Sequence, residues 1–110
     1  MTKEELSAWA LANGWRLMAG SPSLTKPSAP KEAIVRLVFK ATVVTLEVKK
    51  PAGKWDRIAG EAYAKILLDP ETEMPSGLGM QAIPGLRMLM RENRDQQVFA
   101  AMGGAQTSRK

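Results

Sequence analysis

The alternation of apolar and polar residues over Val43–Lys49 constrains the fold of this chain most strongly. One face of a strand with this sequence receives three apolar side chains, those of Val44, Leu46 and Val48. The opposite face receives Thr45, Glu47 and Lys49. The preceding segment Ala33–Lys40 alternates in a similar way, so we expect either a β-hairpin with its turn at residues 40–43 or one long bent strand. The hairpin is the favoured alternative.

A helix signal precedes these strands. Thr2 and Glu5 have the spacing of a capping box, in which each residue satisfies a free backbone N–H of the other. The N-terminal helix is expected to end at Asn13 and Gly14, because these residues adopt the left-handed conformation at little cost. The segment Trp15–Met18 is then expected to form a short strand.

Two further segments indicate helices. Apolar residues recur at helical spacing over Trp55–Leu67, which predicts a second helix. Pro84 suits the first position of a C-terminal helix. Three polar residues, Asn93, Arg94 and Gln97, interrupt the apolar stripe of that helix. One long helix and two short helices therefore both fit the sequence.

Together these elements predict a small single α+β domain over residues 1–102. Its expected core is a helix, a strand, a β-hairpin and a helix, followed by an additional C-terminal helix or two short helices. A chain of 110 residues is long enough to bury one modest core. Two loops are expected, a Ser/Pro-rich exposed loop at residues 19–31 and an acidic, glycine-containing loop at residues 69–83. Residues 103–110 are expected to form a flexible tail.

The composition excludes several kinds of active site. The chain contains neither cysteine nor histidine, so it has no thiolate nucleophile, no imidazole base and no Ser-His-Asp triad. We therefore expect a protein that is not an enzyme and that uses no small-molecule cofactor. No apolar run is long enough to cross a bilayer, and the N-terminus does not have the pattern of a signal peptide. These features predict a cytoplasmic protein that does not bind membranes.

Positive charge is concentrated in the middle of the chain. The formal net charge is +5, and residues 31–68 carry eight basic and four acidic side chains. Such a concentration predicts either an ordinary solvated surface or a binding surface for the phosphates of nucleic acid. Our first hypothesis is a small basic accessory protein that binds nucleic acid with little sequence readout. The candidate residues are Arg36, Lys40, Lys49, Lys50, Lys54 and Arg57.

A second hypothesis is a protein–protein interaction or inhibitor module. Methionine is frequent from Met74 onward, and flexible thioether side chains suit adaptable binding grooves, although they also fill irregular cores. The partner would be another protein or a second copy of this chain. The candidate residues are Leu86, Met88, Met90 and Phe99.

A third hypothesis comes from a family resemblance. The expected order of helix, three strands and helix, with Glu47 and Lys49 on the third strand, resembles the core of the PD-(D/E)xK nucleases. The resemblance implies that the strand carboxylate of Glu47 binds a divalent metal such as Mg²⁺ and that Lys49 orients or activates the attacking water. The family has an aspartate before its second strand. At that place this chain offers only Glu32.

Overall fold

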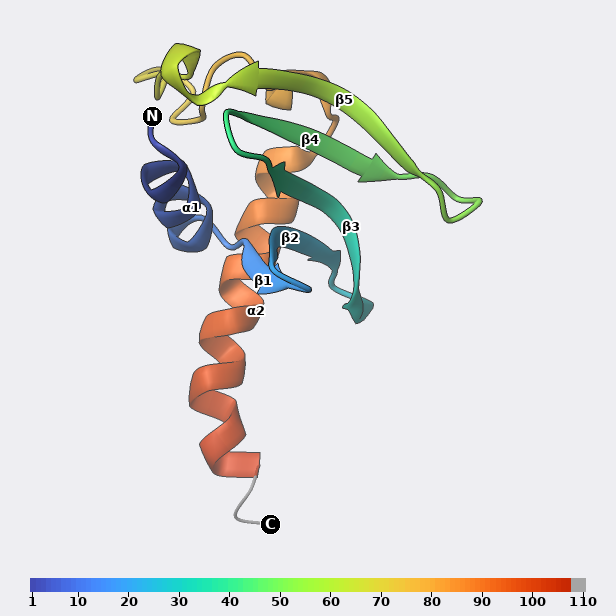
Figure 1. Cartoon of the computed structure of the whole chain (residues 1–110). Helices are drawn as coiled ribbons and strands as arrows, with labels where there is room; N and C mark the ends of the chain where they lie inside the picture. Colours follow the sequence, from blue (N-terminus) through green and yellow to red (C-terminus); the bar gives the residue numbers. More distant parts are fainter. Residues whose placement is uncertain (108–110) are drawn as a thin grey trace.

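The chain folds into one five-stranded antiparallel sheet with two helices (Figure 1), which confirms the predicted small α+β domain. The computed structural model describes residues 1–107, with side chains up to Ala101 in the last helix. Neighbouring strands in the sheet are also neighbours in the chain. The elements are α1 (Lys3–Ala12), β1 (Arg16–Met18), β2 (Ser21–Lys26), β3 (Ala29–Phe39), β4 (Val43–Lys49), β5 (Trp55–Ala62), the 3-10 turns η1 (Tyr63–Lys65) and η2 (Met80–Ala82), and α2 (Leu86–Thr107).

The first helix begins as the sequence predicts. The backbone N–H of Glu5 donates to Thr2 Oγ1 over 3.0 Å, and the N–H of Thr2 donates to Glu5 Oε1 over 2.8 Å, which completes the capping box. The helix ends at Asn13, and Gly14 follows with a φ of +91°. The short strand expected next is also confirmed, since it is β1.

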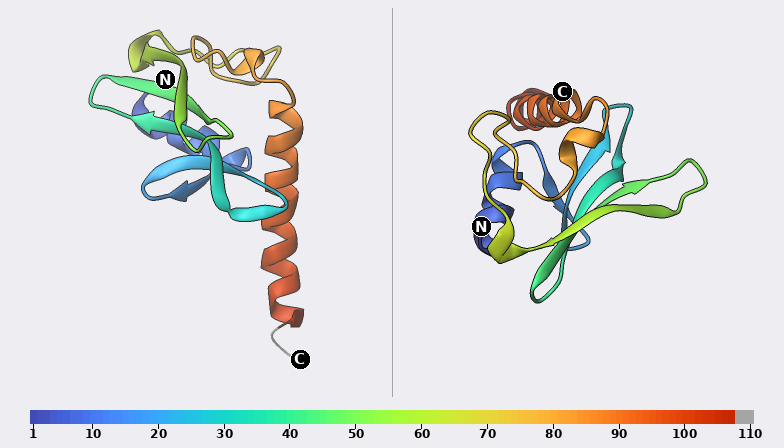
Figure 2. Two further views of the ribbon diagram at one scale, coloured as in Figure 1. Left: turned by 90° about the vertical axis from the view of Figure 1, so that its right-hand side faces the viewer. Right: turned by 90° about the horizontal axis from the view of Figure 1, so that it is seen from above.

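Both helices cover the same face of the sheet, which we call the inner face (Figure 2). Its buried strand residues are Leu24, Val35, Leu37, Val44 and Leu46. They form one core with residues of α1 and α2 and with buried side chains of the segment 66–80. The alternation predicted for β4 is confirmed, because Val44 and Leu46 face this core. The segment 69–83 contains no strand or α-helix, and it contributes Met74, Leu78 and Met80 to the core.

The prediction of an exposed loop at residues 19–31 is wrong. Ser21–Lys26 is strand β2, which pairs with β1 on one side and β3 on the other. Pro22 is tolerated because it faces Leu17 of the three-residue strand β1 at the edge of the sheet. Ser23 and Thr25 of this strand are buried although both are polar. Because β2 pairs with a strand on each side, it forms although its sequence contains few apolar residues.

The prediction of a helix over Trp55–Leu67 is also wrong. Residues 55–62 form β5, which pairs with β4 along its length, and a single 3-10 turn follows. The two strands are joined by a tight turn in which the N–H of Lys50 donates to the Lys54 carbonyl over 2.8 Å. Gly53 adopts a φ of +88° in this turn. Pairing with the free edge of β4 satisfies the backbone of the segment, and this overrides a periodicity that also fits a helix.

The C-terminal helix α2 is continuous, and two of the polar residues in its apolar stripe attach it to β2 and to the residue that follows the end of α1. Asn93, which is only 2 % exposed, donates to the Thr25 carbonyl over 2.8 Å and accepts the Thr25 N–H over 3.0 Å. Its side-chain amide therefore pairs with β2 as a neighbouring backbone would. Gln97 Nε2 donates to the Gly14 carbonyl over 2.7 Å.

The helix α2 extends past the sheet to Thr107 (Figure 1). Helix hydrogen bonds within the backbone carry α2 through the Gly103–Gly104 pair, past residue 103 where the predicted tail begins, and the division into a domain and a tail stays a prediction. The remaining residues of the predicted tail, 108–110, lie outside the described part of the chain. No helix in the described part combines the length and the apolar character of a membrane span.

Candidate functional site

The face of the sheet opposite the helices, which we call the outer face, carries a row of aligned polar residues. In the strand register, Arg16 faces Ser23, Ser23 faces Arg36, Arg36 faces Glu47, and Glu47 faces Arg57. Each of the five strands thus contributes one residue to the row. Because side chains alternate between faces, all five lie on the side opposite the core.

Arg36 lies at the centre of this row and is held on two sides. Its Nε and Nη2 atoms both lie 2.7 Å from Glu47 Oε1, so the pair is a charge-assisted contact between β3 and β4. The guanidinium carbon also lies 4.0 Å from the centre of the Trp55 ring, in the position of a cation–π contact. Glu47 neutralises Arg36, and Arg36 in turn holds the tryptophan on the outer face.

A hollow of about 380 Å³ lies beside this contact. Its charged and aromatic lining comes from β3, from the end of β4 and from the start of β5: Lys31, Glu32, Arg36, Lys49 and Trp55. The opposite wall comes from the β1–β2 hairpin. Among the described residues, neither Lys31 nor Lys49 has a carboxylate within 4.0 Å, so both ammonium groups are free to bind an anion.

Arg57 extends the positive surface along β5. A Cβ atom placed on Gly60 would lie 2.5 Å from Arg57 Nη2 and 3.1 Å from Thr45 Cγ2. The guanidinium therefore occupies the space that the missing side chain of Gly60 leaves open.

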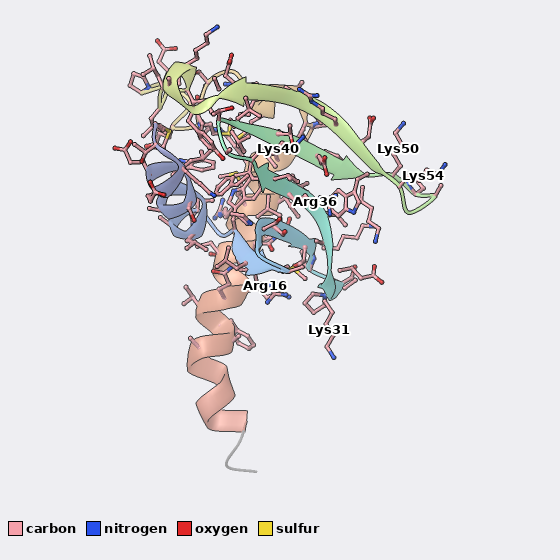
Figure 3. All side chains as sticks on the ribbon, viewed as in Figure 1. Arg16, Lys31, Arg36, Lys40, Lys50 and Lys54 are labelled. Carbon is pink, nitrogen blue, oxygen red and sulfur yellow. The ribbon has the colours of Figure 1, made fainter. Side chains whose placement is uncertain are left out.

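The structure brings together only part of the predicted nucleic-acid-binding set. Arg36, Lys49 and Arg57 lie on the outer face. Lys50 and Lys54 lie at the β4–β5 turn, beyond the sheet (Figure 3), where Lys50 Nζ is 3.8 Å from Asp56 Oδ2.

Lys40 lies at the β3–β4 turn, at the end of the sheet opposite the β4–β5 turn, so it does not belong to the same surface (Figure 3). The sequence interpretation also missed two outer-face cations, Arg16 and Lys31. Arg16 Nη2 donates to the Pro30 carbonyl, which ties β1 to the start of β3. Both residues were missed because residues 19–31 were expected to form a loop. In the structure, β2 pairs with β1, which contains Arg16, and with β3, which contains Lys31.

The predicted partner-binding residues do not form one surface. Leu86 and Met90 are 3 % and 7 % exposed and belong to the core, so they are not accessible to a partner in this structure. Met88 and Phe99 are 65 % and 76 % exposed.

The nuclease residues are placed in a way that does not fit a magnesium site. Glu47 and Lys49 share the outer face, as the alternation predicts. Glu47, however, is already bound by the Arg36 guanidinium, a cation at the place a metal would take. Within the described residues, no group of three acidic side chains could hold a metal ion. The helix expected after the Glu-x-Lys strand is β5 instead.

The outer face thus arranges free cations around a fixed aromatic ring, and the charge of this arrangement is complementary to that of a polyanion. Glu32 and Glu47 are the acidic side chains that its hollow and its central row contain. The chain matches no protein-family model, no curated protein and no solved structure.

Proposed function

We propose that this protein binds nucleic acid, without reading its sequence, through the outer face of the sheet. The observation that carries the proposal is the row of one aligned residue from each strand, with Arg36 packed on Trp55 at its centre. A rigid sheet face with cations at its rim and an aromatic ring in its middle has the features that nucleic-acid-binding sheets use.

The distribution of charge supports this function. The outer face carries five cations, Arg16, Lys31, Arg36, Lys49 and Arg57, against the two carboxylates of Glu32 and Glu47. Long Lys and Arg side chains on an exposed strand face reach phosphate oxygens, and such interactions supply affinity without sequence information. Lys50 and Lys54 at the β4–β5 turn would extend this positively charged surface beyond the sheet.

Trp55 adds an interaction that is not electrostatic. Its ring is partly exposed and lines the hollow, so a nucleobase could stack on it while the phosphates contact Lys49 and Arg57. Stacking of one base on an aromatic ring contributes about 1–3 kcal/mol and tolerates any base. Single strands, whose bases are free to stack, should therefore bind more tightly than duplexes.

The test is a fluorescence-anisotropy titration of the protein with labelled single-stranded and duplex DNA and RNA, at low and high salt. Affinity should fall steeply with salt. In the double variant K49Q/R57Q the salt slope on duplex DNA should fall by roughly 0.9 for each phosphate that the variant no longer neutralises.

The matched control is K3Q/K65Q, which removes the same charge from α1 and the 3-10 turn after β5, away from the outer face. This control should bind nearly as the wild type does. Equal weakening in both double variants would show that net charge alone drives binding, and an absence of binding at low salt would refute the proposal.

Protein binding through the end of α2 is a second candidate function. Val98 and Phe99 are exposed on the part of this helix that passes beyond the sheet. An isolated stretch of helix is only marginally stable, so a partner that covers these residues would stabilise it. The substitution Phe99→Ser would then weaken self-association or partner capture, in sedimentation or pull-down measurements, without changing the salt dependence of nucleic-acid binding.

A further inference from the structure

A second cationic site lies on the helix side of the sheet, in a cleft of about 570 Å³. One wall is the first half of α2, where Arg87, Arg91 and Arg94 follow one another at spacings of four and three residues. Such spacings place the three side chains on one side of the helix. The facing wall is the segment Thr72–Met74, and Asn13 at the end of α1 closes one end.

The three arginines are not neutralised by neighbouring carboxylates. The ion pairs among the described residues are Arg36–Glu47 and Lys50–Asp56, and neither involves α2. Arg87 Nη2 donates to the Thr72 carbonyl. Arg91 and Arg94 are exposed and also line the cleft. One carboxylate, that of Glu73, also lines it. The lining therefore carries three positive charges and one negative charge.

The wall opposite α2 is fixed rather than loose. Trp9 Nε1 donates to the Glu73 carbonyl over 2.9 Å, and the Glu73 N–H donates to the Asp69 carbonyl over 2.7 Å. Glu73 has a φ of +59°, a conformation that residues other than glycine rarely adopt. Backbone strain of this kind persists only where surrounding contacts enforce it, and it is common at binding sites. Here the two hydrogen bonds of the Glu73 backbone hold this residue in the wall facing α2.

We propose that this cleft binds a nucleoside phosphate. Arg91 and Arg94 would contact the phosphate, since guanidinium groups match phosphate oxygens in charge and geometry. Glu73 would accept hydrogen bonds from sugar hydroxyls. The thioether of Met88, which is exposed and lines the same cleft, would pack against the flat base.

The size and position of the cleft agree with such a ligand. Small-molecule sites commonly have volumes of roughly 300–1,000 Å³. The cleft lies among α1, α2 and the segment 72–74, all on the side of the sheet opposite the Arg36–Trp55 contact. The inference is therefore independent of nucleic-acid binding on the outer face.

The test is isothermal titration calorimetry with adenosine 5′-monophosphate, adenosine and inorganic phosphate. The monophosphate should bind, inorganic phosphate should compete with it, and adenosine should bind much more weakly. In R91Q/R94Q the dissociation constant for the monophosphate should rise about 10-fold or more, because neither glutamine can form a charge-assisted hydrogen bond to the phosphate. Both side chains are exposed, so the variant should keep the wild-type circular-dichroism spectrum.

The outer-face variant K49Q/R57Q removes the same charge and serves as the matched control. It should bind the monophosphate as the wild type does, while R91Q/R94Q should bind single-stranded nucleic acid as the wild type does. The inference is overturned if the wild type does not bind the monophosphate, or if adenosine binds equally well. Equal weakening in both double variants would also overturn it.

Discussion

The two faces of the sheet are built from the same strands but have opposite properties. The inner face is apolar and covered by the two helices, and it is joined to α2 by buried hydrogen bonds of Asn93 and Thr25. The outer face carries a row of charged side chains around Arg36 and Trp55. Because neighbouring residues of a strand point to opposite faces, this separation lets substitutions test stability and binding one at a time.

The largest effect is expected where the inner side is packed most closely. A Cβ atom on Gly14 would lie 2.3 Å from the Met90 carbonyl oxygen, and the φ of Gly14 is +91°. The substitution Gly14→Ala must therefore push α2 away as well as strain the backbone. We expect it to lower the free energy of unfolding by roughly 4 kcal/mol. Urea denaturation followed by circular dichroism measures this decrease.

The matched control is Gly20→Ala. Gly20 has a similar φ of +82°, but nothing lies within 4 Å of the added Cβ atom. This variant should be destabilised by only about 1 kcal/mol, the cost of the left-handed conformation alone. If the two alanine variants were equally stable, the close contact between Gly14 and α2 would be wrong.

A smaller decrease is expected for Asn93→Ala. The substitution leaves the N–H and the carbonyl of Thr25 buried without partners and also removes the hydrogen bond to the Leu89 carbonyl. The free energy of unfolding is expected to fall by about 3 kcal/mol. The control Gln96→Ala removes one exposed hydrogen bond of 3.2 Å to the Pro27 carbonyl, and it should change stability little. Comparable decreases in both variants would contradict the proposed attachment of α2.

The attachment of α2 also illustrates what the sequence can and cannot predict. The capping box, the short strand after Gly14 and the β3–β4 hairpin depend on local signals, and all three are confirmed. The interruption of the apolar stripe by Asn93 is visible in the sequence too. Its meaning is not, because the partner of Asn93 lies 68 residues away on a strand that local signals do not predict.

The two wrong predictions have a common physical cause. Ser21–Lys26 has little intrinsic preference for a strand, and Trp55–Ala62 fits a helix as well as a strand. Both become strands because each pairs with a neighbour whose edge is otherwise free. The outer-face row crosses both segments, so of the cations at the candidate site the sequence alone identifies only Arg36, Lys49 and Arg57.

The outer face should respond to substitution in the opposite way to the inner face. Glu47→Gln removes the carboxylate bound by Arg36, whose side chain is a third exposed. An ion pair at this exposure contributes about 0–1 kcal/mol, so the free energy of unfolding should change little. Single-stranded nucleic acid should bind about 2- to 5-fold more tightly, because the outer face no longer carries the negative charge of Glu47, which repels phosphates.

Anisotropy titrations of the Glu47→Gln variant measure this gain, with Glu92→Gln on α2 as a control of equal charge. Weaker binding by the Glu47 variant would contradict the outer-face interface. Cleavage of nucleic acid with Mg²⁺ by the wild type, abolished in this variant, would restore the nuclease hypothesis.

The smallest effect concerns the pH dependence of stability on the inner side. The backbone N–H of Thr2, and then its hydroxyl, hold the pKa of the Glu5 carboxyl below its usual 4.5. A lowered pKa in the folded state means that this contribution to stability is present above pH 4.5 and is lost as the pH falls through the folded value.

In Glu5→Gln the amide can still accept the Thr2 N–H, so the variant should fold at neutral pH and lose less stability than the wild type on acidification. Thermal unfolding of both proteins at neutral and acidic pH measures the difference, and equal acid-induced destabilisation would contradict the role of Glu5. Charge at the start of α1 thus adjusts the stability of the covered side slightly, whereas on the outer face charge is the proposed basis of binding itself.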